Sequence, residues 1–117
     1  MKFRFPRYVP VLAAGDMANF FGNENRACLM GWVRNVFIRV YKGTPLCTDK
    51  RLRDVYEAIR KAGQEVSERY RASGCSGITT LNDTYCESNA ERARVWNLAM
   101  VFLGYTEGNP ETERAKE

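Results

Sequence analysis

The stretch TTLNDTYCESNAERARVWNLAMVFLGY, residues 79–105, decides how this chain divides into helices. Ser88 and Glu91 have the spacing of a capping box, in which the serine accepts from the amide of Glu91 and the glutamate reaches back to the amide of Ser88. Apolar residues then recur three and four positions apart, which predicts a helix that begins after Ser88. Gly104 is a natural end for this helix. The predicted apolar stripe consists of Ala93, Trp96, Met100 and Leu103, with Val95, Leu98 and Phe102 beside it.

The five residues before this helix, Asn82-Asp83-Thr84-Tyr85-Cys86, are predicted to form a tight polar turn. Asparagine and aspartate side chains bond to nearby backbone amides in such turns, so a structural role is favoured. The triplet Asn82-Asp83-Thr84 also matches the short N-glycosylation pattern. The expected cytoplasmic location argues against its being a glycosylation site. Asp83 and Glu87 could pair as acid and base, although their spacing is not diagnostic of catalysis.

Cys86 is the one nucleophile candidate in this region. It precedes a predicted helix N-terminus, where the helix dipole can lower the pKa of a thiol. A cysteine nucleophile usually needs a neighbouring base, and the chain contains no histidine. The same absence argues against serine–histidine mechanisms and most catalytic metal sites. A small, semi-buried residue at a helix start is therefore the favoured interpretation of Cys86.

A second helix is predicted over residues 48–73. Thr48 is a good N-cap and Asp49 suits the first turn, where the helix dipole favours negative charge. Gly63 is expected to kink or divide the helix, and Gly74 to end it. The apolar stripe comprises Leu52, Val55, Tyr56, Ile59, Ala62, Val66 and Tyr70, opposite a charged face.

The apolar run RACLMGWVRNVFIRVY, residues 26–41, is predicted to be a central helix capped by Asn23 or Asn25. Its β-branched residues would also suit a strand, but the run is long for one. Gly31 inside the helix indicates close approach by another element.

Less regular segments flank these helices. Residues 1–8 alternate basic and aromatic side chains and are predicted to form an extended segment or a loose arm. A short helix is expected over residues 10–21, with Pro10 in its first turn. Residues 106–117 are polar, lack an apolar stripe and are predicted to be a flexible tail. The folded domain is therefore expected to span residues 9–105.

The composition is that of an ordinary globular domain: 117 residues, 44% hydrophobic, with a net charge of +4. No apolar run approaches the ~20 residues needed to cross a bilayer. The N-terminus resembles a secretory signal only faintly, because Pro6, Arg7 and Pro10 interrupt it. A cytoplasmic protein is expected.

Four cysteines, Cys28, Cys47, Cys75 and Cys86, are present, and none forms a CxxC pair. Free thiols are favoured over disulfides because no export signal is visible, and over a metal site because histidine is absent. No cofactor is expected.

The excess of positive charge is compatible with a nucleic-acid-binding function. The candidate residues are Lys2, Arg4 and Arg7 on the N-terminal arm, extended by Arg34, Arg39 and Lys42. Interleaved cations and aromatic rings can hold phosphates and stack on bases. The competing interpretation is a solvated set of cations over an apolar body.

Two short motifs, Cys28-Leu29-Met30-Gly31 and Ile78 to Thr84, resemble the DUF6197-like family of uncharacterised small bacterial and phage proteins. The resemblance implies a fold signature in which Gly31 lets another backbone approach. The Asn82-Asp83 turn would be what approaches, with Asn82 capping exposed backbone groups. It carries over no activity, although small phage proteins of this kind often bind a host or phage macromolecule. The predicted structural motif residues are Cys28, Gly31, Asn82, Asp83, Ser88 and Glu91.

Together these features predict a mainly α, compact single-domain bundle of about four helices, with one short β pair formed by the N-terminal arm or around Ile78. The expected function is non-enzymatic: a small cytoplasmic protein, encoded by a phage or mobile element, that binds a host or phage protein and modulates or inhibits a host defence system. Nucleic-acid binding through the basic arm is the alternative, and an enzyme using Asp83 and Glu87 is a third.

Overall fold

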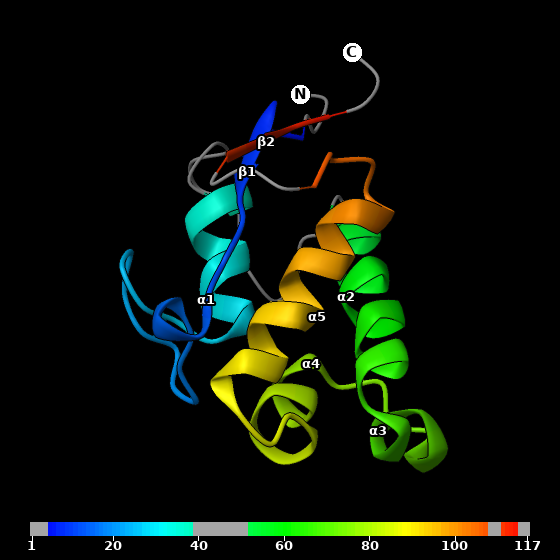
Figure 1. Cartoon of the computed structure of the whole chain (residues 1–117). Coiled ribbons are helices and arrows are strands. Elements are labelled where there is room, and N and C mark those ends of the chain that lie inside the picture. The colour runs from blue at the N-terminus through cyan, green and yellow to red at the C-terminus, as the bar shows by residue number, and fades with distance from the viewer. Residues whose placement is uncertain (1–4, 39–51, 108–110, 115–117) are drawn as a thin grey trace.

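The computed structural model describes residues 5–38, 52–107 and 111–114 (Figure 1). The elements in chain order are β1 (Tyr8–Pro10), a 3-10 turn (Ala14–Asp16), α1 (Leu29–Val33) with a π-helical continuation (Arg34–Ile38), α2 (Arg53–Val66), α3 (Glu68–Ser73), α4 (Ile78–Thr80) with a π-helical continuation (Leu81–Tyr85), α5 (Asn89–Phe102) and β2 (Glu111–Glu113). The predicted fold class, a mainly α domain with one short strand pair, is confirmed.

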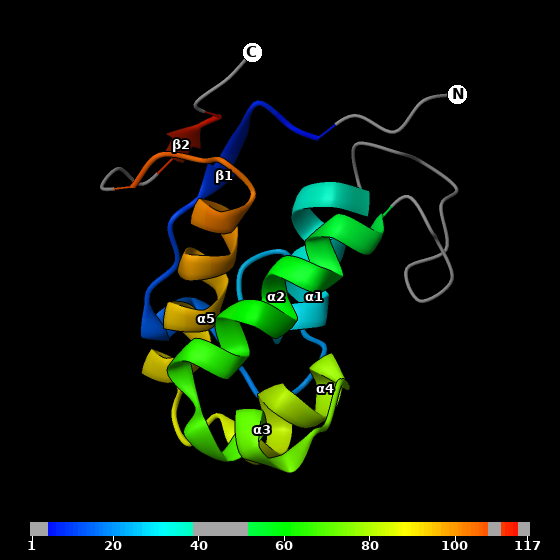
Figure 2. The same cartoon turned by 90° about the vertical axis from the view of Figure 1, so that its right-hand side faces the viewer.

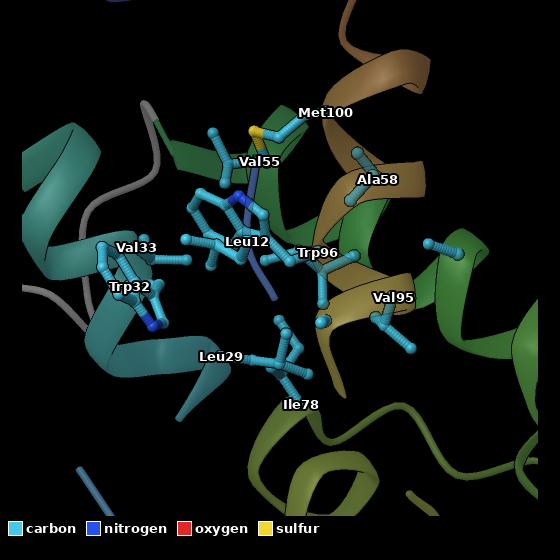
Figure 3. Packing of buried hydrophobic residues seen from close by; sticks show 14 of the residues in the cluster. Leu12, Leu29, Trp32, Val33, Val55, Ala58, Ile78, Val95, Trp96 and Met100 are labelled. Atoms are coloured by element: carbon cyan, nitrogen blue, oxygen red, sulfur yellow. The ribbon is translucent and has the colours of Figure 1, made fainter. Parts of the chain in front are cut away.

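Helix α5 packs along α2 in both views (Figures 1 and 2). Trp96 of α5 is fully buried at the centre of the core. Its ring lies 6.4 Å from that of Trp32 and 6.3 Å from that of Phe37, which joins α5 to α1 and its continuation. Figure 3 shows Trp32, Val33, Val55, Trp96 and Met100 in this shared interior. Burial of such large apolar side chains is the main source of stability.

Helix α2 packs against α5 and has the predicted apolar stripe, with Val55, Ile59 and Ala62 buried, and Ala58 is buried beside them. The helical run divides at Ser67, whose hydroxyl accepts from the amide of Tyr70 at 3.2 Å and starts α3. The prediction that Gly63 divides the run is wrong. Gly63 is instead a packing position, because a Cβ atom there would lie 2.4 Å from Leu81 Cδ2.

The end of this helical run is as predicted, since Gly74 closes α3 with a φ of 72°. Helix α5 also ends as expected. Gly104 has a φ of 96°, and the amide of Tyr105 donates to the carbonyl of Met100 at 3.0 Å, which is the Schellman pattern. The predicted caps Thr48 and Asp49 lie outside the described residues.

The predicted helix over residues 10–21 is wrong: only Ala14–Asp16 form a 3-10 turn, and α5 binds the backbone of Pro10 and Leu12. The side-chain amide of Asn97 accepts from the Leu12 amide and donates to the Leu12 carbonyl, both at 2.8 Å. Trp96 Nε1 donates to the Pro10 carbonyl at 3.1 Å. These bonds satisfy the carbonyls of Pro10 and Leu12, which a helix would have paired internally, and the amide of Leu12.

The strand pair joins the two ends of the described chain. Strand β1 runs antiparallel to β2, with Val9 opposite Thr112. The Thr112 side chain is buried and its hydroxyl donates to the carbonyl of Val9 at 3.1 Å. The prediction of a tail without regular structure is therefore wrong for residues 111–113. The alternative strand around Ile78 is also wrong, because Ile78 begins α4.

Candidate interaction surface

A ten-residue loop, residues 18–27, precedes α1 and is closed tightly at its base. Its ends meet where Met17 forms a parallel β-bridge with Ala27. The amide of Ala18 donates to the carbonyl of Ala27 at 3.0 Å, and the amide of Cys28 donates to the carbonyl of Phe20 at 3.0 Å. We call residues 18–27 the aromatic loop, after its two exposed phenylalanines.

The tip of the aromatic loop is shaped by local turn chemistry. Gly22 has a φ of 76°, which non-glycine residues rarely adopt. The side-chain oxygen of Asn23 accepts from the amides of Asn25 at 2.8 Å and Arg26 at 3.1 Å. Asn23 is therefore a turn residue, and the prediction that Asn23 or Asn25 caps the following helix is wrong.

Two side chains from the π-helical continuation of α1 brace the tip. Arg34 Nη1 donates to the carbonyl of Gly22 at 3.3 Å, and Asn35 Nδ2 donates to that of Asn23 at 2.9 Å. Arg26 also braces the loop, since its Nε donates to the Met17 carbonyl at 2.9 Å. The loop is thus tied to a helix and to its own base.

Gly31 is the place where the loop backbone touches α1. A Cβ atom at Gly31 would lie 2.1 Å from the carbonyl oxygen of Phe21 and 2.6 Å from Ala27 Cβ. The predicted close approach is present, but the approaching backbone is that of Phe21. The expectation that the Asn82-Asp83 turn approaches Gly31 is wrong.

Asn82 is nevertheless a cap, as predicted. Its Oδ1 accepts from the amide of Leu29 at 3.1 Å, in the first turn of α1. Its Nδ2 donates to the carbonyl of Ala18 at 3.3 Å, and to Asp83 Oδ1 at 2.9 Å. Cys28 is the N-cap, with Sγ accepting from the amide of Gly31 at 3.4 Å. Because Asn82 is 1% exposed, its nitrogen is inaccessible to glycosylation in the folded protein.

A buried arginine, Arg92, holds this turn against α5. Its Nε donates to the carbonyl of Asn82 at 2.8 Å, its Nη1 to Asn89 Oδ1 at 2.7 Å and its Nη2 to the carbonyl of Cys86 at 3.4 Å. Sequence reasoning missed this role, because apolar periodicity gives no signal for a buried cation that bonds to carbonyl groups.

The aromatic loop presents two neighbouring rings to solvent. Phe20 is 53% exposed and Phe21 is 45% exposed. The guanidinium of Arg26 lies 5.7 Å from the centre of the Phe20 ring, and that of Arg34 lies 4.3 Å from the centre of the Phe21 ring. The loop stands beside the start of α1 at the edge of the molecule (Figure 1). It combines exposed aromatic area, nearby cations and a braced backbone.

The predicted basic surface falls largely outside the described residues, where Lys2, Arg4, Arg39 and Lys42 lie. Arg7 forms an ion pair with Glu113 at 2.7 Å, beside the strand pair. Arg34 is half-buried and serves the aromatic loop. The two described candidates therefore have acceptors within the protein.

The predicted acid–base pair also has structural partners. Asp83 accepts from Asn82, as described above, and Glu87 forms an ion pair with Arg69 at 3.3 Å. The capping box is present in part. The amide of Glu91 donates to Ser88 Oγ at 3.2 Å, while Glu91 Oε1 accepts from the amide of Glu87 at 3.4 Å instead of that of Ser88.

Cys86 is buried at 3% exposure. Burial raises the pKa of its thiol from 9.0 to about 11, outweighing the nearby charge of Arg92. The environment thus opposes the thiolate form that a nucleophile needs. The three described cysteines, Cys28, Cys75 and Cys86, are free, as predicted, and Cys47 lies outside the described residues.

We expect Cys86 to resist alkylation in the native protein at pH 8, while the half-buried Cys75 reacts at least ten times faster. Because the folded-state pKa lies above the unfolded value, the thiol favours folding below about pH 9, and this contribution is lost as pH rises towards 11. Iodoacetamide labelling followed by peptide mass spectrometry measures the alkylation rates of Cys75 and Cys86. Equal rates at Cys75 and Cys86 would contradict the burial of Cys86, and labelling in denaturant provides the control.

Within the part of the chain that the structure describes, no group of three or more cysteine, aspartate or glutamate side chains could hold a metal ion. No helix among the described residues is both long and apolar enough to cross a membrane. Comparison with protein-family models, curated proteins and solved structures found no match to this chain.

Proposed function

We propose that the protein is a non-enzymatic binding protein, and that the aromatic loop is its main contact with a partner protein. The observation that carries the proposal is the pair of neighbouring rings, Phe20 and Phe21, each about half exposed on a loop braced from several sides. Aromatic and arginine side chains are enriched at the energetic centres of protein interfaces.

The bracing of the loop supports this proposal thermodynamically. Ordering a flexible loop on binding costs free energy, which reduces the affinity. Here Arg34, Asn35 and the contact at Gly31 already hold the loop backbone in place. A partner with an apolar pocket rimmed by acidic groups would bury the two rings and face Arg26. The resemblance noted above makes a host or phage protein, and modulation of a host defence system, the narrower form of the proposal.

Capture of partners from a lysate of the native host tests the proposal. The tagged wild-type chain is compared with the Phe20→Ala/Phe21→Ala double variant, with and without nuclease. The matched control is Phe102→Ala, because Phe102 is also an exposed phenylalanine (39%) with a cation, Lys61, 4.8 Å from its ring centre. We expect the wild type and the control to capture one protein, whether or not nuclease is present.

Titration with that purified partner then measures how much affinity the double variant loses. Truncation of a single anchor residue typically costs about 2 kcal/mol or more, which is ~30-fold in affinity, so we expect the double variant to bind at least ~30-fold more weakly. Unchanged affinity in the double variant would overturn the role of the aromatic loop. Capture that disappears with nuclease and falls steeply with salt would instead support nucleic-acid binding.

A further inference from the structure

A second candidate surface lies along one side of α5, and none of its lining residues belongs to the aromatic loop. A half-open groove of about 330 Å³ runs between α5, the β1 segment and the end of α2. Its middle is apolar, with Leu98 and Val101 of α5, Val11 after β1 and Val66 of α2 among its lining residues. Val11 is 37% exposed although it is a large aliphatic residue. An exposed apolar groove of this kind typically marks a binding surface.

Opposite charges stand at the two ends of this groove. Arg94 lies in the second turn of α5, and Glu107 lies beyond the C-terminal end of the helix. The helix rises about 10 Å between Arg94 and Val101 alone, so the two charges are well separated. Among the described residues, neither side chain has an ion-pair or hydrogen-bond partner. The groove is therefore an apolar strip with an available cation at one end and an available anion at the other.

We propose that this groove binds the same groove of a second copy of the chain, forming a two-fold symmetric dimer. A two-fold axis through the middle of the strip reverses the direction of the second copy. Arg94 of each copy then faces Glu107 of the other, which gives two equivalent ion pairs. Because the two copies run in opposite directions, Leu98 of each copy then faces Val101 of the other between these pairs, so the apolar strip is covered.

Other occupants fit this pattern less completely. A small amphiphile with a carboxylate head would pair with Arg94, but it would leave Glu107 at the other end without a partner. A second copy satisfies both charges and the apolar strip with one geometry. The strip along α5 from Arg94 to Val101 is short, and stable complexes bury roughly 1,200 Å² or more of total area. We therefore expect a dissociation constant in the micromolar range.

Sedimentation velocity and equilibrium of the purified chain, from 5 to about 500 μM, test the proposal with charge reversals chosen by symmetry. The wild type should show a monomer–dimer equilibrium. Arg94→Glu and Glu107→Arg should each weaken the dimer at least tenfold, because each places like charges opposite one another. The Arg94→Glu/Glu107→Arg double variant should recover the wild-type dissociation constant within about threefold, since it restores both pairs.

Two further variants control this experiment. Arg71→Glu makes the same charge reversal on the exposed surface of α3 and should leave association unchanged. Leu98→Asp should abolish association, with circular dichroism confirming that the fold is retained. A chain that stays monomeric throughout overturns the proposal. So does a dimer that the single reversals leave intact, or one that the double reversal fails to rescue. Binding of a fatty acid to the monomer that depends on Arg94 would assign the groove to an anionic amphiphile.

The dimer and the proposed function can fail separately. Sedimentation uses the purified chain without a partner, and the Phe20→Ala/Phe21→Ala variant should associate like the wild type. Conversely, the Arg94→Glu variant keeps the aromatic loop intact, so it should still capture the partner protein.

Discussion

Replacement of Asn82 by alanine is expected to destabilise the protein by about 3 kcal/mol. The side-chain amide of Asn82 pairs the amide of Leu29 and the carbonyl of Ala18. Both residues are buried, and each orphaned backbone group costs roughly 1–3 kcal/mol. The loss should lower the melting temperature by roughly 10 °C for a domain of this size. Urea denaturation followed by circular dichroism measures the change in the free energy of unfolding.

The neighbouring residue provides a matched control for this variant. Asp83→Ala removes an exposed carboxylate that accepts from Asn82 but leaves the bonds to Leu29 and Ala18 in place. We expect it to cost less than about 1 kcal/mol. If Asn82→Ala costs no more than Asp83→Ala, then water replaces the missing amide and the capping role is unimportant for stability.

Replacement of Gly31 by alanine is expected to destabilise the protein by roughly 2–3 kcal/mol, although alanine is the better helix former. The added Cβ would lie 2.1 Å from the carbonyl oxygen of Phe21, so one backbone must move. Because that carbonyl belongs to the aromatic loop, the variant should also bind the proposed partner more weakly. Thermal unfolding measures the first effect, and titration with the partner measures the second.

Gly15 is the appropriate control for Gly31. A Cβ atom there would have nothing within 4 Å, so Gly15→Ala should leave the melting temperature nearly unchanged. Equal melting temperatures for the two alanine variants would show that the loop moves away from α1 at little cost, and the loop would then not be braced as described.

The helices were predictable where local signals agree with one another. In α5, the serine cap, the apolar periodicity and the terminal glycine all indicate the same boundaries, and the structure confirms them. In α2, the spacing of Val55, Ile59 and Ala62 predicted the buried stripe. The break at Ser67 was not predicted, because glycine has the lower helix propensity, whereas Ser67 forms a cap within the run.

The candidate interaction surface was not predictable in the same way. Phe20 and Phe21 were placed at the end of a helix, where their exposure could not be anticipated. Their position follows from contacts with α1 and its continuation, and from the turn at Gly22 and Asn23. The sequence predicted that Asn82 caps backbone groups. It did not predict that these groups are the amide of Leu29 and the carbonyl of Ala18.

By itself, the sequence determined the helical class, the two principal helices and the glycine ends, since these depend on residues a few positions apart. The tertiary structure alone decided the extended β1 segment, the aromatic loop and the strand at the C-terminal side. Asn97 reaches across 85 positions to Leu12, and Asn82 reaches across 53 positions to Leu29. The bonds to Leu12 outweigh local helix propensity, and the bond to Leu29 caps α1, because each pairs a backbone group that would otherwise be buried without a partner.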